Sequence, residues 1–206
     1  MACKFNHTIA LLSALVATAA AIAGFSASAA AAAAAKPAAD CQPYSGRPCL
    51  FPFPDNRFTR ADKHSVTGRR VNLPAKAMPA NTAGQRITVG PYNRNDGFSP
   101  GSAIVLHVQG LDNQRAMNRT GAVPLTNMAR SFAKRQPIVV IDQATGKRQL
   151  IWSELDANAT DAADRDLMIH PGKDFLDGHT YVVALRNLRT ASGKRIPAPR
   201  WFARLR

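Results

Sequence analysis

The clearest alternation of hydrophobic and polar positions lies between Asp166 and Pro197. An apolar run, Leu167–Ile169, stops at Pro171-Gly172, a pair that is typical of a strand end. A second run, Thr180–Arg186, is rich in β-branched and aromatic residues, and both of its faces are largely apolar. A strand with two apolar faces is expected inside a sandwich. One of those faces holds Tyr181, Val183 and Leu185.

Shorter runs upstream repeat this pattern. Residues 103–109 predict a strand in which Ile104, Leu106 and Val108 share one face and His107 points to the other. Residues 137–141 and 148–152 predict two strands, and the turn residues 142–146 between them predict a β-hairpin. Further strands are expected at residues 71–73 and 86–90 and, after the turn at residues 191–194, at Arg195-Ile196.

Two polar stretches separate these strands. Residues 113–121 predict a loop. Residues 125–134 predict a short helix or an irregular connection, because Leu125, Met128 and Phe132 recur at helical spacing. Several short strands divided by turn residues predict a mainly β fold, a sandwich rather than an α/β domain.

The first 29 residues have the pattern of a secretory signal peptide. A short basic start with Lys4 precedes the apolar run Ile9–Phe25, and small residues then supply an Ala-x-Ala-like cleavage site. The alternative is a membrane anchor, but the apolar run is short for a bilayer span, which needs about 20 residues. We therefore expect cleavage, secretion to the periplasm or the medium, and no membrane span in the mature form.

Composition divides the rest of the chain into three parts. Residues 30–40 predict an Ala-rich flexible leader, because small residues cannot bury a core. Residues 41–100 predict an irregular, extended segment that packs on the sandwich. Within it, two prolines exclude Leu50–Pro54 from an interior strand, and its two phenylalanines are expected to cover one end of the core. Residues 101–206 are expected to form the sandwich.

Cys41 and Cys49 remain after the signal peptide is removed. Two cysteines close together in an exported chain predict a disulfide that closes a small loop. The alternative is a metal pair, but a structural zinc site uses four ligands and no histidine lies near. We expect no metal and no other cofactor in this protein.

The formal net charge is +14, from 27 Lys and Arg against 13 Asp and Glu. Such a charge favours acidic partners, including anionic wall polymers and acidic polysaccharides. The alternative is that the charge serves solubility and reflects the frequent use of arginine in proteins of a GC-rich genome. The sequence has no recognition-helix pattern and no aromatic RNA-binding strand, so no specific nucleic-acid partner is expected. The candidate anion-binding residues are Arg69, Arg70, Lys194 and Arg195.

The order of elements at the C-terminal end resembles a bacterial Ig-like domain of secreted and S-layer-type proteins. The resemblance rests on Pro171-Gly172, Asp177-Gly178, the Tyr-x-Val-x-Leu run from Tyr181, and Ser192-Gly193, and it covers roughly residues 138–197. It implies an Ig-like β-sandwich and a secreted context. It carries no catalytic residue across.

Residues 97–101, Gly-Phe-Ser-Pro-Gly, match the Gly-x-Ser-x-Gly pattern of serine hydrolases. In those enzymes the serine follows a buried strand and opens a helix, whereas polar residues precede Ser99 and an expected strand follows it. The residue after the nucleophile donates its backbone N–H to the oxyanion hole, and Pro100 has none. We therefore expect no catalytic residue here and no enzymatic activity.

Three weaker groups of polar residues have a structural alternative that we favour. The loop oxygens at residues 93–96 lack the spacing of an EF-hand calcium site. Glu154 and Asp156 could act as an acid–base pair, but carboxylates on a hairpin are usually solvated. A third group, His170 and His179 with the aspartates between them, suggests hydrogen bonding in a turn more than a metal site.

A second resemblance covers the region from Cys49 through FPFPDNRFT, TGRRVNLP and NRNDGFSPGS. These segments look like the N-terminal, non-catalytic region of large secreted bacterial proteins of the hydrolase type. The resemblance implies a module with a structural or binding role, whose partner is a downstream domain or another secreted or cell-wall component. The alternative is an accessory domain of a secreted α/β-hydrolase of the esterase or lipase type, which contributes to substrate access.

Overall fold

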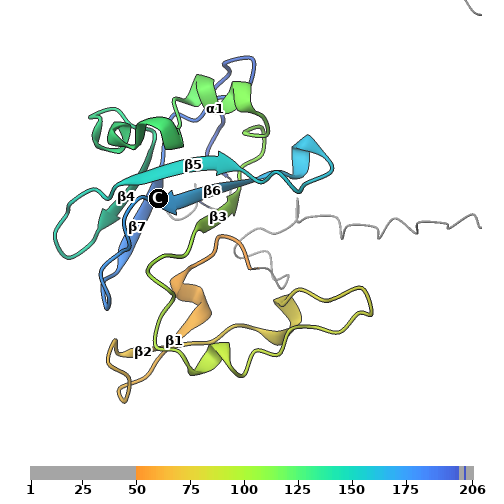
Figure 1. Ribbon diagram of the computed structural model, residues 1–206, viewed down its shortest axis with the longest axis vertical. Helices are drawn as coiled ribbons and strands as arrows, with labels where there is room; N and C mark the ends of the chain where they lie inside the picture. Colours follow the sequence, from red (N-terminus) through yellow and green to blue (C-terminus); the bar gives the residue numbers. More distant parts are fainter. Residues whose placement is uncertain (1–49, 200–201, 203–206) are drawn as a thin grey trace, which may run out of the picture. The chain divides into compact units, whose positions relative to one another are not determined.

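The structure is a computed structural model that describes residues 50–199 and 202 (Figure 1). The expected signal peptide, the expected leader and the expected Cys41–Cys49 disulfide lie outside these residues. The regular elements are 3-10 helix η1 (Asn56–Phe58), β1 (Thr59–Ala61), β2 (Arg69–Val71), η2 (Ala75–Ala77), η3 (Tyr92–Arg94), β3 (Ile104–His107), α1 (Gln114–Thr120), η4 (Leu125–Phe132), β4 (Ile138–Asp142), β5 (Ile151–Leu155), η5 (Ala162–Asp164), β6 (Asp166–Pro171) and β7 (Tyr181–Leu185).

Every strand pair among the described residues is antiparallel. The largest sheet has three strands in the order β3-β6-β5, and Figure 1 shows them side by side. A second sheet pairs β4 with β7, and a third pairs β1 with β2. The expected β-rich fold with short helical elements is confirmed at this level.

One hydrophobic core joins the two sheets formed by β3 to β7. Its buried residues come from both sheets, from α1 and from the connecting loops; they include Ile104, Met117, Ile138, Val140, Ile151, Leu167 and Ile169. The expected inward face of β7 is confirmed, because Tyr181, Val183 and Leu185 pack against this core. Its other face is not covered as an interior strand would be, since Val182 is 48% exposed and, among the described residues, β7 pairs with β4 alone. The outward face of β3 carries His107, as the alternation predicts.

The hairpin predicted from residues 137–141 and 148–152 is wrong beyond its turn. The turn itself forms, since the Asp142 N–H donates to Lys147 O over 2.9 Å and the Gln149 N–H donates to Val140 O over 2.8 Å. The chain then leaves β4, and β5 pairs with β6 in the other sheet, with Ser153 opposite Ile169. The switch places Ile151 in the shared core, where it is fully buried.

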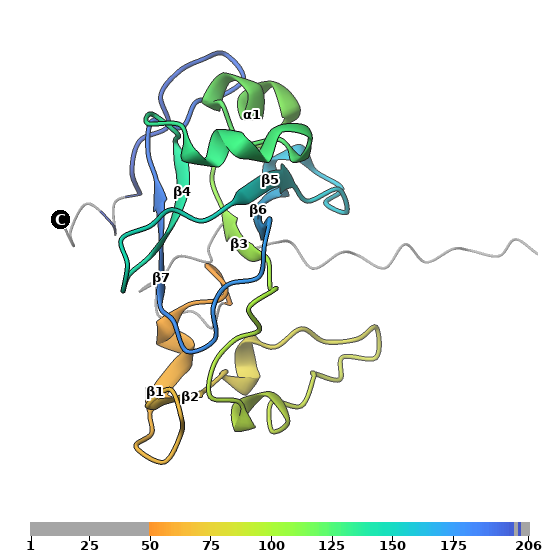
Figure 2. The same ribbon diagram turned by 60° about the vertical axis from the view of Figure 1, so that its left-hand side comes forward.

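The outer edge of β5 is covered by η4 and by the loop before it (Figure 2). The Ser131 hydroxyl donates to Ile151 O over 2.8 Å and accepts from the Ile151 N–H over 3.0 Å. The Ser153 N–H donates to Val123 O over 2.8 Å. These contacts satisfy backbone groups that an open sheet edge would leave unpaired.

The loop predicted at residues 113–121 is wrong, because this stretch forms the helix α1. Asn113 caps the helix by accepting from the Ala116 N–H over 3.0 Å, and Gly121 ends it in the left-handed conformation at φ 78°. Ala116, Met117 and Thr120 are the buried positions. The buried face is narrow and only partly apolar, so periodicity alone did not reveal it.

The strand predicted at residues 86–90 is also wrong. Only Arg86 forms a β-bridge, with Ala80, and the neighbouring side chains are largely exposed. Val89 alone of this stretch packs against a hydrophobic cluster, and so small an apolar contact does not support a ladder. The strand expected at residues 71–73 lies slightly earlier, at Arg69–Val71.

Residues before β3 contain a small hydrophobic cluster of their own. Phe58, Val71, Leu73 and Met78 are buried in it, and Phe53 and Phe98 pack against it. Phe53 also pairs with Val105, and their backbone hydrogen bonds of 2.9 and 2.7 Å extend the edge of β3. Thus Phe53 joins this cluster to the three-stranded sheet. Within the described residues, no helix combines the length and the apolar character that crossing a bilayer requires.

Candidate functional site

The predicted anion-binding residues lie in two separate segments. Arg69 and Arg70 belong to β2, and Lys194 and Arg195 belong to the turn region after β7. Among residues 50–199, no hydrogen bond or ion pair links one pair to the other. The sequence analysis grouped these four residues because all are positively charged. The structure separates them into two pairs.

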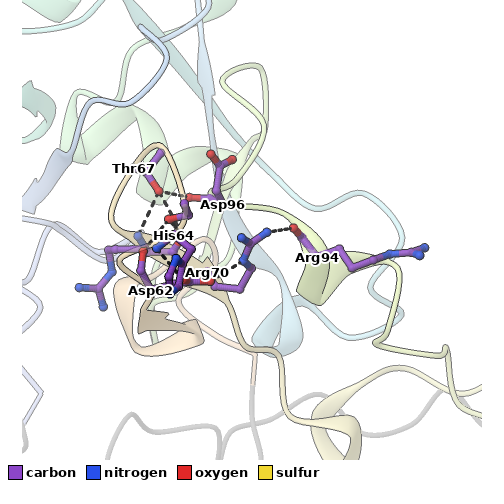
Figure 3. A network of polar contacts seen from close by, with 8 residues as sticks. Asp62, His64, Thr67, Arg70, Arg94 and Asp96 are labelled. Atoms are coloured by element: carbon purple, nitrogen blue, oxygen red, sulfur yellow. Dashed lines mark hydrogen bonds and ion pairs between the residues drawn. The ribbon is translucent and has the colours of Figure 1, made fainter.

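Arg70 is part of a polar network that holds the turn between β1 and β2 (Figure 3). Its Nε lies 2.9 Å from Asp62 Oδ2, and its Nη1 donates to the carbonyl oxygen of Arg94. Thr67 donates from its hydroxyl to the carbonyl oxygen of Asp96 in the same network. The backbone N–H of His64 and the guanidinium of Arg70 together hold the pKa of Asp62 below its usual range. The Arg70 charge is therefore largely matched by Asp62.

Arg69 donates to neutral oxygens of β1 and of η1. Its Nε donates to Thr59 Oγ1 over 2.6 Å, and its Nη2 lies 3.4 Å from Asn56 O. The side chains of Lys194 and Arg195 are exposed and make no hydrogen bond within the described residues. Their backbone closes a turn, in which the Thr190 N–H donates to Lys194 O over 2.9 Å. An anion-binding role for these four residues stays a prediction.

A third basic group lies where the sequence analysis named no site. Arg148 donates to Ala133 O over 2.6 Å and to Lys134 O over 3.3 Å. Arg186 donates to the same Lys134 O over 3.0 Å and to Gln136 O over 3.2 Å. Two guanidinium groups far apart in the sequence thus meet at one carbonyl oxygen. Arg135 and Lys134 themselves are exposed beside them.

The sequence held only part of the signal for this group. Lys134-Arg135 and Lys147-Arg148 are visible as adjacent pairs of basic residues. Arg186 comes from the end of β7, and it reaches Lys134 because β7 pairs with β4, with Leu185 opposite Ile138. That pairing is a long-range contact, which residue spacing does not reveal.

Three histidines each contact a carboxylate. His107 lies 3.2 Å from Asp166, its cross-strand neighbour, and His179 lies 3.0 Å from Asp142. The hydrogen bond with Asp166 raises the pKa of His107 above its usual range, against the opposing effect of burial. At Asp142, burial favours the protonated acid, but hydrogen bonds from His179, the Ala144 N–H and Thr145 outweigh it and hold the pKa below its usual range.

The third histidine, His170, stacks on Trp152 with ring centroids 4.0 Å apart and an angle of 10° between the planes. Its Nε2 lies 3.1 Å from Glu154. Glu154 therefore contacts a histidine of β6, and the sequence analysis did not anticipate this contact. No group of three histidine, cysteine or acidic side chains in the described part of the chain is placed to hold a metal ion.

Ser99 lies in a turn that leads into β3. The Ser102 N–H donates to Ser99 O over 3.0 Å, and β3 begins at Ile104. The 3-10 helix η3 precedes this turn. A nucleophilic elbow has the opposite order, with a strand before the serine and a helix after it.

Comparisons with family models, with curated proteins and with solved structures found no match.

Proposed function

We propose that this chain is a secreted, non-catalytic β-sandwich module of the Ig-like type that binds an anionic polymer outside the cell. It forms the N-terminal part of a larger secreted protein. The antiparallel sheets β3-β6-β5 and β4-β7, which share one core, support the sandwich. The net charge of +14 supports an anionic partner.

The observation that carries the proposal is how the arginines are held. Several guanidinium groups donate to neutral carbonyl or hydroxyl oxygens, which fix their positions, and no carboxylate of residues 50–199 lies within ion-pair distance of these groups. A folded surface with positioned, unmatched guanidinium groups suits planar, many-donor recognition of oxyanions. These arginines are Arg69, Arg86, Arg148, Arg186 and Arg189.

The non-catalytic part of the proposal has separate support. Ser99 lies in a turn whose next residue, Pro100, has no N–H to donate to an oxyanion. His107 and His179 contact carboxylates of neighbouring strands, which hold the histidines within the β framework.

Binding of the purified full chain to immobilised anionic polymer tests the proposal, with neutral dextran as the control surface. We expect retention on the anionic surface at low salt and none on dextran, because the attraction is electrostatic. Equal retention on both surfaces would contradict an anionic partner. Hydrolysis of a generic ester, abolished by Ser99→Ala, would contradict the non-catalytic role and favour the hydrolase alternative.

A further inference from the structure

The guanidinium groups of Arg148 and Arg186 each donate two hydrogen bonds to backbone carbonyl oxygens of the turn at residues 133–136. The turn beneath them is closed by the Gln136 N–H, which donates to Ala133 O over 2.9 Å, and Gln136 is buried. The Arg186 N–H donates to Pro137 O over 2.9 Å, which ties the end of β7 to the same turn. Binding an anion would therefore need little further ordering of these two side chains.

Both groups keep unused donors. A guanidinium has five N–H donors, and the contacts with the turn use two donors of each arginine. In the described part of the chain, no carboxylate lies within ion-pair distance of either group, so both positive charges stay unmatched. The exposed side chains of Lys134 and Arg135 add two further charges at the same turn.

The number of free donors argues for a ligand with more than one anionic group. Three donors remain on each guanidinium, six in all, which is more than the about four hydrogen-bond sites of a single carboxylate. Each phosphodiester of a phosphate polymer accepts through two non-bridging oxygens, so the six donors can engage more than one phosphate, and arginine forks match the geometry of these groups. Four neighbouring cations also suit a polymer with repeated phosphates better than one isolated ion.

We propose that Arg148 and Arg186, flanked by Lys134 and Arg135, form a binding site for the phosphate groups of a cell-surface polymer of the glycerol-phosphate type. The inference rests on the proposed function, since it names the polymer and the residues that bind it. The carbonyl oxygens of residues 133, 134 and 136 position the guanidinium groups.

The test measures the affinity of the full chain for purified glycerol-phosphate polymer as a function of salt. The first variant is Lys134→Gln with Arg135→Gln, which removes two charges and leaves the arginine–carbonyl contacts in place. The second is Arg148→Lys with Arg186→Lys, which keeps the charge and removes the forks. We expect about tenfold weaker binding for the first variant, and a salt slope lower by about two. The second variant is expected to lose affinity at an unchanged net charge.

The control is Lys63→Gln with Lys76→Gln, two exposed lysines whose loss changes the net charge by the same amount. Thermal unfolding of each variant checks that the fold is kept. Equal affinity loss in the control and the Lys134–Arg135 variant would overturn the site while leaving the proposed function intact, as would full affinity in both test variants. No binding of polymer by the wild type would overturn the proposed function itself.

Two further probes test the chemistry of the anion. Poly-glutamate at equal charge concentration is expected to bind more weakly than the phosphate polymer, and equal binding would overturn the preference for phosphate. Inorganic phosphate is expected to compete only at high concentration, because it offers one contact where the polymer offers many. Tighter binding to duplex DNA at equal phosphate concentration would overturn the choice of polymer.

Discussion

Gly172 directly follows β6, and its surroundings leave no space for an added methyl group. A Cβ at this glycine would lie 2.8 Å from Leu150 Cγ and 3.1 Å from Met128 Sδ. The Pro171-Gly172 pair was predicted from the sequence as a strand end, and the structure adds the reason for glycine. The turn packs against two side chains that leave no room.

Gly172→Ala is therefore expected to destabilise the protein by about 1–3 kcal/mol, the usual cost of overpacking. Chemical unfolding in urea measures it. Gly90→Ala is the matched control, because a Cβ at Gly90 would have nothing within 4 Å. Equal stabilities of the two variants would contradict this prediction, because Leu150 and Met128 would then move aside without loss of stability.

A second prediction at the residue scale concerns how His107 makes the stability of the fold depend on pH. Its pKa in the folded protein is raised, mainly by the hydrogen bond with Asp166. The folded state therefore binds the proton more tightly than the unfolded chain. Its stabilising contribution is complete below about pH 6.5, the unfolded value, and is lost as the pH rises through the raised pKa.

His107→Gln is expected to flatten the fall in the free energy of unfolding between about pH 6 and pH 8. Urea unfolding at several pH values measures this slope in both proteins. His64→Gln, at an exposed turn position, is the control and should keep the wild-type slope. A slope that survives in His107→Gln would place the titration on another group.

At the scale of elements, the side chain of Ser131 hydrogen-bonds η4 to the edge of β5. Ser131 is 2% exposed, and its hydroxyl bonds to both the N–H and the carbonyl oxygen of Ile151. At Ile151 it supplies the hydrogen bonds that a fourth strand would otherwise supply, while Val123 O accepts from the Ser153 N–H. Removing the hydroxyl leaves two buried backbone groups without partners.

Ser131→Ala is expected to cost about 1–3 kcal/mol and to raise hydrogen exchange at the Ile151 amide. Exchange measured by NMR reports the amide, and urea unfolding reports the stability. Thr126→Ala, at an exposed position of the same helix, is the control. Unchanged protection of Ile151 in Ser131→Ala would mean that the strand edge is held by other contacts.

The strands that were predicted correctly are those with a clear alternation of apolar and polar residues. Residues 103–109 and 180–186 gave strands with the correct inward faces, because alternation is a local signal. The partner of β5 was missed, since a turn between two apolar runs favours a hairpin and says nothing of a strand that changes sheets. The helix α1 was missed although Asn113 and Gly121 carry its capping signals.

The candidate site shows the same division. Basic residues were visible in the sequence, but Arg148 and Arg186 meet only because β4 pairs with β7. Conversely, Arg70 was a candidate by charge, and its ion pair with Asp62 became visible only in the folded turn. Charge is a property of composition, whereas the matching of charges depends on long-range pairing.

At the scale of the whole molecule, the net charge of +14 favours binding to polyanions. Among the described residues, several arginines donate to neutral oxygens, so their positive charge is not cancelled by a carboxylate and can attract an anion. Asp62 and Asp142, whose pKa values are lowered, stabilise the fold above about pH 4, and this contribution is lost as the pH falls through their folded pKa values. Polymer binding is therefore best measured near pH 6, where these carboxylates are charged and His107 still stabilises the fold.

The most direct measurement is the association constant of the full chain for glycerol-phosphate polymer, recorded over a range of sodium chloride concentrations. We predict a linear fall of log K with log salt, with a slope of about one for each phosphate that is neutralised. Absence of binding at low salt, or an association constant that does not respond to salt, would contradict an anion-binding role for this protein.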